Sequence, residues 1–175
     1  VTVAGIIIFS LLIAFLSTYF EQKLENLQKG KSQVVEKEFS LILGWNDKIF
    51  DIIEELVIAN ENQKKPAIVI LSELDKIEMD EIITDRIEDR ENTRIITRSG
   101  ISSHFNDLER VNFNQAKSII LLSKSSAGAT EEEKISSDSE IIKTLLAILY
   151  HPKRVNKSFN IVTEIYDPKN IDLIN

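Results

Sequence analysis

A short apolar run that ends at a glycine constrains the fold of this chain more than any other feature. Residues 39–43 read Phe-Ser-Leu-Ile-Leu, which is typical of a buried strand, and Gly44 follows directly. Asn46 or Asp47 can then cap a helix whose apolar residues keep a helical spacing through Val57. A buried strand, a glycine turn and a capped helix form the first unit of a Rossmann-like sheet. The pattern therefore predicts an α/β domain that begins at this strand.

Strand and helix patterns alternate regularly after this first unit. Apolar runs of strand type recur at residues 67–71, 93–97, 118–122 and 159–165. Segments with helical spacing separate them, at residues 75–89, 102–111 and 135–149. Strands that alternate with helices predict a parallel sheet, because strand–helix–strand crossovers are right-handed. We therefore expect a Rossmann-like, doubly wound parallel sheet of five strands over residues 39–175.

The first twenty residues of the chain contain no charged side chain. Twenty residues of helix rise about 30 Å, which matches the hydrocarbon core of a bilayer. Lysines follow closely, at positions 23, 29, 31 and 37. By the positive-inside rule these lysines place the following segment in the cytosol. We predict one transmembrane helix over residues 1–20 and a linker over residues 21–38, with residues 21–175 cytosolic; a buried core helix is the alternative for the apolar run.

Length and composition narrow the classes of protein further. The 175 residues have room for one α/β domain and a short appendage. The chain starts at Val1 rather than Met and ends just after a predicted strand, so we expect a fragment of a longer protein. A net charge of −7 argues against nucleic-acid binding, which needs a basic face. Without cysteine, neither a disulfide nor a thiolate metal site can form.

The turn after the first predicted strand is the first candidate for a ligand site. In dinucleotide-binding sheets this turn reads G-x-G-x-x-G, so that the backbone can approach the pyrophosphate. Here Gly44 is followed by Trp45, Asn46 and Asp47, so a bulky indole and a carboxylate stand near the place of the phosphates. Glu73, at the end of the second strand, is placed to accept a hydrogen bond from a ribose hydroxyl, or it is a simple solvated strand end. The sequence argues against NAD as a ligand and leaves a regulatory cation such as calcium open.

The remaining polar residues point to no catalytic chemistry. We expect His104 and His151 at the surface and the run Glu131–Glu133 in a solvated loop. The sequence has no nucleophile–base pair, Walker loop or cluster at metal-ligand spacing, so we predict that the protein is not an enzyme. The candidate residues for a ligand cleft are therefore Gly44, Trp45, Asn46, Asp47, Glu73 and Gly100.

A series of short motifs along the chain resembles one family of ion channels. The motifs are Lys29-Gly30-Lys31-Ser32, Val34-Val35-Glu36, Leu41-Ile42-Leu43-Gly44-Trp45-Asn46-Asp47-Lys48, Ile58-Ala59-Asn60, Val69-Ile70-Leu71, Glu78-Met79, Arg98-Ser99-Gly100 and Ala116-Lys117-Ser118-Ile119-Ile120. They resemble the Castor/Pollux/Sym8 cation channels, in which such a linker joins the last pore helix to a strand ending in leucine-glycine-tryptophan. More broadly, the chain is similar to the regulator-of-potassium-conductance (RCK, or TrkA-N-like) domains. The resemblance suggests a prokaryotic relative.

This resemblance implies a function for the whole protein. It implies a ligand-gated cation channel, permeable to potassium or calcium, that crosses the cell membrane several times and forms a homotetramer with a cytosolic gating ring. The regulatory ligand is not identified by it. The alternative is a membrane-anchored, nucleotide-sensing regulatory subunit of a potassium transporter, or a Rossmann oxidoreductase. A pore loop directly upstream of Val1 would distinguish the channel from these alternatives.

The segment between the apolar run and the sheet is expected to transmit movement. Residues 21–28 can continue the membrane helix, so that force would pass directly along it. Gly30 then breaks the helix, and we expect it to act as a local swivel. The sheet domain would in this way act as a lever on the pore.

Overall fold

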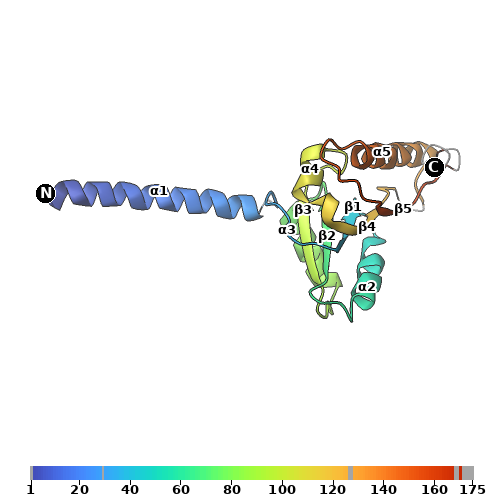
Figure 1. Cartoon of the computed structure of the whole chain (residues 1–175), viewed down its shortest axis with the longest axis horizontal. Coiled ribbons are helices and arrows are strands. Elements are labelled where there is room, and N and C mark those ends of the chain that lie inside the picture. Colours follow the sequence, from blue (N-terminus) through green and yellow to red (C-terminus); the bar gives the residue numbers. More distant parts are fainter. Residues whose placement is uncertain (1, 29, 126–127, 168–169, 171–175) are drawn as a thin grey trace.

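A computed structural model describes residues 2–28, 30–125, 128–167 and 170 of the chain. A long N-terminal helix, α1 (Thr2–Gln28), projects from a sheet domain that contains the other elements (Figure 1). The strands are β1 (Phe39–Leu43), β2 (Ala67–Ser72), β3 (Arg94–Ser99), β4 (Ala116–Leu121) and β5 (Asn160–Thr163). The helices are α2 (Ile49–Ala59), α3 (Lys76–Arg86), α4 (Phe105–Arg110) and α5 (Glu131–Leu149), with a short 3-10 helix at Phe113–Gln115.

The five described strands form one sheet in the order β3-β2-β1-β4-β5. All four neighbouring pairs are parallel. The chain builds outward from β1 to β3 on one side, then crosses to β4 and builds outward on the other. The strand order therefore reverses between β1 and β4. This arrangement confirms the predicted Rossmann-like, doubly wound parallel sheet.

The two faces of the sheet bury two separate cores. Leu41 and Leu43 of β1 belong to a core that α4 and α5 cover. Ile42, between them, belongs to a second core that α2 and α3 cover. Because successive side chains of a strand point to opposite faces, a central strand covered on both sides is apolar throughout. This explains why β1 and β2 read as nearly continuous apolar runs rather than as alternating patterns.

The start of α2 differs from the predicted cap. The residue before the helix is Lys48, and its side chain makes no capping hydrogen bond. Asn46 Oδ1 instead accepts a hydrogen bond from Lys48 N at 2.9 Å, which closes a turn ahead of the helix. The prediction that Asn46 or Asp47 caps the helix is therefore wrong.

The start of α5 also lies earlier than predicted. Thr130 caps this helix: its hydroxyl accepts from Glu133 N, and the Glu133 carboxylate accepts from Thr130 N. This reciprocal capping box satisfies backbone donors that a helix start otherwise leaves free. Glu131–Glu133 consequently form the first turn of α5, where the helix dipole favours negative charge, and not a solvated loop.

One of the two histidines is in the core. His151 is 4% exposed and lies between the rings of Phe105 and Phe113, with both ring centroids 4.8 Å away. Its Nδ1 accepts from Lys153 N at 3.1 Å, so Nε2 carries the proton and faces the Phe105 carbonyl oxygen at 3.2 Å. The prediction of a surface position is wrong for His151. His104 is exposed, as expected.

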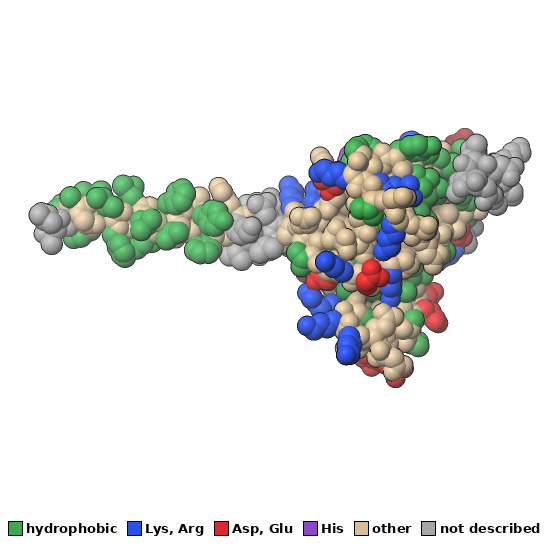
Figure 2. Space-filling model, in the orientation of Figure 1, with side chains coloured by type: hydrophobic (Ala, Val, Ile, Leu, Met, Phe, Trp, Pro, Cys, Tyr) green, Lys and Arg blue, Asp and Glu red, His purple; other side chains and the backbone are tan. Residues whose placement is uncertain are grey.

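Helix α1 has no apolar partner within the described chain. Its segment Val3–Gln22 is long and apolar enough to cross a membrane, and none of it is buried against other described residues. Figure 2 shows hydrophobic side chains around the coloured part of this helix. The helix continues beyond the expected twenty residues to Gln28, which agrees with the expectation that residues 21–28 extend it.

The segment that joins α1 to β1 is bound to the sheet domain. We call residues 30–38 the strap. Val34 is 1% exposed and belongs to the core beneath α4 and α5, and its N–H donates to Arg110 O at 2.8 Å. Ser32 O accepts from Arg98 Nε at 2.7 Å, and Glu38 N donates to Gln115 O at 2.9 Å. The strap is therefore packed onto the sheet domain as a part of it.

The start of the strap shows how Gly30 is used. Gly30 is buried, with a φ of +64° that favours glycine. A Cβ at this position would lie 3.1 Å from Ser99 N and 3.1 Å from Lys76 Cβ. Gly30 thus turns the chain while packed against the end of β3. The structure places the expected local swivel at a buried residue, and the swivel itself stays a prediction.

Candidate functional site

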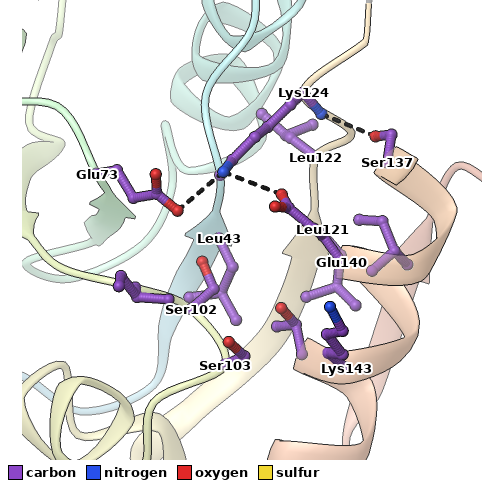
Figure 3. A pocket seen from close by; sticks show the side chains of 14 residues that line it. Leu43, Glu73, Ser102, Ser103, Leu121, Leu122, Lys124, Ser137, Glu140 and Lys143 are labelled. Atoms are coloured by element: carbon purple, nitrogen blue, oxygen red, sulfur yellow. Dashed lines mark hydrogen bonds and ion pairs between the residues drawn. The ribbon is translucent and has the colours of Figure 1, made fainter. Parts of the chain in front are cut away.

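A cleft opens at the carboxyl edge of the sheet, at the point where the strand order reverses. It has a cavity volume of about 130 Å³ and lies between the ends of β1 and β4, the loop after β3 and one face of α5 (Figure 3). Ligands of open α/β sheets bind outside the carboxyl ends of the strands at such a switch point. The cleft is therefore the candidate functional site.

Two backbone segments, at Gly44 and at Leu122, pack closely together and form the floor of the cleft. Gly44 has a φ of +104°, and a Cβ there would lie 2.5 Å from Leu122 O. The neighbouring backbone is fixed by hydrogen bonds from Gly44 N to Leu71 O (2.9 Å) and from Leu122 N to Leu43 O (2.8 Å). Glycine is needed at this position because the end of β4 passes so closely, a reason that involves no ligand.

The side chain of Lys124 crosses the cleft. Its Nζ lies 2.8 Å from Glu73 Oε1 and 3.0 Å from Glu140 Oε2 (Figure 3). Burial alone would lower the pKa of Lys124, but the hydrogen bonds to Glu73 and Glu140 and their charges raise it above its ordinary value. The three side chains are 46–53% exposed, so water reaches them. An ammonium group of the chain itself thus occupies the space between the two carboxylates.

The loop that carries Lys124 is fastened to α5. Ser123 Oγ and Ser137 Oγ are 2.6 Å apart, and Lys124 N donates to Ser137 Oγ at 3.1 Å. Ser125 N donates to Ser123 Oγ at 3.1 Å. Both hydroxyl groups are buried, so these bonds replace the water that the loop would otherwise need. The bonds fix where Lys124 leaves the backbone, while its long side chain reaches into solvent.

The structure brings two of the six candidate residues to the cleft. Gly44 and Glu73 line it. Trp45 packs edge-on against Phe50 instead, with 5.9 Å between ring centroids. Asn46 Nδ2 donates to Ser123 O at 2.7 Å and so joins the loops after β1 and β4.

The two other candidates also lie away from the lining of the cleft. Asp47 is exposed beside the start of α2. Gly100 lies next to the Asp107 side chain, where a Cβ would be 2.8 Å from Asp107 Cγ. Gly100 therefore allows the Asp107 side chain to pack closely against the backbone behind the wall of the cleft.

Sequence reasoning missed most of the polar residues that line the cleft. They are Ser102, Ser103, Lys124, Ser137, Glu140, Lys143 and Thr144. A signal for some of them exists in the sequence. Lys124 is the second residue after the fourth apolar run, at the edge where ligands bind. Ser137, Glu140 and Thr144 share one face of a helix by their spacing of three and four residues.

The chemistry of the cleft is that of a small polar site. Among the residues that the structure describes, no group of three or more His, Asp or Glu side chains is placed to hold a metal ion. Glu73 and Glu140 both form ion pairs with the Lys124 ammonium group (Figure 3). Ser102 and Ser103 contribute hydroxyl groups from the loop after β3. The turn after β1 contains a single glycine, and the side chain of Lys124 lies in the cleft beside it.

The chain is similar to curated ion channels over most of its length. It is 31% identical over 148 residues to the probable ion channel CASTOR of Oryza sativa subsp. japonica. It is 33% identical over 148 residues to the ion channel DMI1 of Medicago truncatula. Each alignment covers 85% of this chain and 16% of the relative, so the chain spans about a sixth of their length. The predicted resemblance to the Castor/Pollux/Sym8 channels is confirmed.

A solved structure shares the fold. The protein described as "GsuK channel bound to NAD" superimposes with a TM-score of 0.56 at 16% sequence identity. The match covers 95% of this chain and 25% of that chain. At this identity the likeness concerns the fold alone.

A family match covers the whole sheet. Residues 37–163 match the family described as the calcium-activated potassium channel slowpoke-like RCK domain. The matched region begins in the strap and ends at Thr163, the last residue of β5. It includes the switch-point cleft and every helix that covers the sheet. With its sheet order and this match over more than half of its length, the chain belongs to the slowpoke-like RCK domain family.

Proposed function

We propose that this chain is part of a ligand-gated cation channel subunit, permeable to potassium or calcium, in the cell membrane. In this proposal residues 1–20 form a pore-lining transmembrane helix, residues 21–38 a linker, and residues 39–175 the cytosolic regulatory domain. The relatives are named as ion channels, and the matched family is named for a domain of potassium channels. The full-length subunit would cross the membrane several times and act as a channel rather than as an enzyme.

The observation that carries this proposal is the relation of α1 to the sheet domain. The helix exposes apolar side chains on all sides over Val3–Gln22 and then leads without a break to Gln28. An exposed apolar surface of this length is unfavourable in water and favourable in lipid. The strap then binds the domain through Val34 and Arg98. A movement of the domain would therefore reach a membrane helix through few intervening residues.

Assembly into a homotetramer with a gating ring belongs to the same proposal. The outer face of α5 supports it, because Ile135, Leu146, Leu149 and the neighbouring Tyr150 are 37–76% exposed. Figure 2 shows hydrophobic side chains along the upper edge of the domain, where Figure 1 places α5. Apolar side chains gathered on one helix face are typical of surfaces that contact another protein.

The cleft supports a small regulatory ligand rather than a dinucleotide. Lys124 and the two carboxylates that it joins line the small space beside Gly44. We therefore expect no tight binding of NAD, NADH or ATP, and we retain a cation such as calcium as a candidate ligand. Calorimetric titration of the chain with each nucleotide should give only heats of dilution. A saturable isotherm at low micromolar nucleotide would favour the alternative, a membrane-anchored nucleotide sensor.

Cation flux through the full-length protein tests the channel itself. Reconstituted into liposomes, the protein should pass potassium or calcium ions above the level of protein-free liposomes. In planar bilayers, its open probability should depend on the Ca²⁺ concentration on the cytosolic side. Inserting several flexible Gly-Ser residues after Gln28 should abolish this dependence and leave conductance and selectivity intact.

The matched control is the same insertion after Gly128, which has open space around it ahead of α5. This variant should keep the dependence on Ca²⁺, because the connection between α1 and the strap is unchanged. Absence of flux from the full-length protein would contradict the channel proposal. An unchanged response in the Gln28 insertion would contradict the lever.

A further inference from the structure

The wall of the cleft after β3 is connected to the strap by a short chain of polar contacts. Ile101, Ser102 and Ser103 form this wall. Ile101 N donates to Asp107 Oδ2 at 2.8 Å. The Asp107 side chain therefore fixes the backbone at the point where the wall leaves the sheet. Gly100 allows this contact, since a Cβ there would lie 2.8 Å from Asp107 Oδ2.

The second contact leads from Asp107 to Arg110, one turn further along α4. Arg110 Nη2 lies 2.7 Å from Asp107 Oδ1, with the two side chains 22% and 12% exposed. Arg110 Nη1 donates to Ser99 O at 2.8 Å, at the end of β3. Charge-assisted hydrogen bonds between largely buried groups are stronger than the same bonds at the surface. Asp107 and Arg110 thus hold α4, the end of β3 and the cleft wall in one arrangement.

The third contact reaches the strap. Arg110 O accepts the hydrogen bond of Val34 N at 2.8 Å. Gly30 packs against Ser99, whose carbonyl oxygen is the one that Arg110 binds. The strap therefore touches this group of contacts twice, through its backbone at Val34 and through Gly30. The strap contacts at Glu36 with Arg94 and at Glu38 with Gln115 lie further from the cleft along the sheet.

We propose that Asp107 and Arg110 are positioning residues that couple the cleft wall at residues 101–103 to the strap. A ligand or side chain that displaces the wall moves Asp107 through Ile101, and α4 and Val34 follow through Arg110. Energetic coupling of this kind needs packed, hydrogen-bonded elements between the two sites, and here two side chains supply it. The inference itself concerns the sheet domain. Its role in gating rests on the proposed function.

Hydrogen exchange of single amides tests the route without any channel activity. In the Asp107→Asn variant the amide oxygen can still accept from Ile101 N, but the ion pair with Arg110 is lost. For the 175-residue chain in detergent micelles, we expect the Val34 amide to exchange about tenfold faster, the equivalent of about 1.4 kcal/mol. Glu38 N–H, bonded to Gln115 O on the same strap, is the internal reference and should be unchanged. Equal acceleration at both amides, or none at Val34, would overturn the route.

The matched control lies on the same helix. Glu109 precedes Arg110 and pairs with Lys153 at 2.7 Å, away from the strap. The Glu109→Gln variant removes an acidic charge from α4, as Asp107→Asn does, without touching the route. We expect Val34 to exchange at the wild-type rate in this variant. A tenfold acceleration here as well would assign the effect to α4 as a whole and contradict the role of Asp107.

A second pair of variants tests the link to the cleft. Ser102→Phe adds bulk to the cleft wall and should change the exchange of Val34 by about threefold or more. In the Asp107→Asn background the same substitution should have no further effect on Val34, because the connection is already cut. Additive effects of the two substitutions would overturn the coupling.

These outcomes are separate from those of the channel experiment. If Val34 responds as expected and the full-length protein passes no cations, the coupling stands and the channel proposal fails. If the protein conducts cations and Ser102→Phe leaves the exchange rate of the Val34 amide unchanged, the coupling fails and the channel proposal stands.

Discussion

The cleft opens at the carboxyl edge of the sheet, and the strap begins at the same edge. Different kinds of contact stabilise the two regions. The strap is anchored by Val34, which is 1% exposed, and by hydrogen bonds between backbone groups. The rim of the cleft is closed by Lys124, whose side chain is 48% exposed between two exposed carboxylates. Buried apolar contacts contribute far more to stability than exposed ion pairs do. The difference indicates that the rim can rearrange at little cost, whereas the strap moves with the domain.

Arg98 illustrates how firmly the strap is held. Its Nε donates to Ser32 O and its Nη1 to Thr97 O, both at 2.7 Å. Burial lowers the pKa of Arg98, and the nearby charges of Glu36 and Asp80 act in the opposite direction. A guanidinium group stays protonated in proteins even so. Arg98 therefore supplies a permanent cation between the strap and β3.

The largest effect is expected at the floor of the cleft, where the contrast between rim and floor can be measured. Gly44→Ala would place a Cβ 2.5 Å from Leu122 O at a φ of +104°. We expect a loss of about 3 kcal/mol or more in the free energy of unfolding, since both backbone strain and a clash oppose the variant. Gly128→Ala, with nothing within 4 Å, is the control and should change stability little. Thermal denaturation measures both; a loss at Gly44 below about 1 kcal/mol would contradict the rigid floor.

An intermediate effect is expected in the strap. Val34→Ala removes two buried methyl groups and should lower the free energy of unfolding by about 2 kcal/mol. Val35, its neighbour, is 79% exposed, so Val35→Ala should stay within about 0.5 kcal/mol of the wild type. Urea unfolding of the two variants compares the same substitution at adjacent positions. Equal stabilities would mean that the strap does not fold with the domain.

The sheet could be predicted from the sequence because its strands are buried on both faces. Val69 and Ile70 of β2, for example, are fully buried in different cores, and a run of such residues stands out against polar surroundings. Element ends were predicted less well, because caps depend on single side chains. The capping box of Thr130 and Glu133 has a recognisable spacing in the sequence. No such spacing distinguishes the turn between Asn46 and Lys48 from a helix cap at Asn46.

The cleft could be predicted only in part, for a physical reason. Gly44 and Glu73 follow strand ends directly, so topology alone brings them to the switch point. Glu140 comes from the middle of α5, and its position depends on how that helix packs across the sheet. The strap was predicted as a linker because isolated residues such as Val34 carry no periodic signal. Its contacts with Arg98 and Arg110 join residues far apart in the sequence.

The smallest effect is expected at the rim itself. Lys124→Met removes both ion pairs and should lower the free energy of unfolding by no more than about 1 kcal/mol, because the partners are exposed and solvated. Even this difference should shrink at about 1 M NaCl, where screening shortens the reach of charge to about 3 Å. Lys143→Met is the control, since Lys143 lines the same cleft and bridges no carboxylate pair among the described residues.

The pH dependence of this difference has a definite sign. The folded protein raises the pKa of Lys124 because Glu73 and Glu140 outweigh the effect of burial. A group whose pKa is higher in the folded state stabilises that state fully below its unfolded pKa, which is about 10.4 for lysine. The stabilisation is lost as the pH rises through the raised value. Wild type and Lys124→Met should therefore differ constantly between about pH 6 and 9 and converge above about pH 10.5. A difference of several kcal/mol in the free energy of unfolding, or one that grows in alkaline solution, would contradict this prediction. It would mean that Lys124 stabilises the fold as strongly as the buried contacts of the strap do.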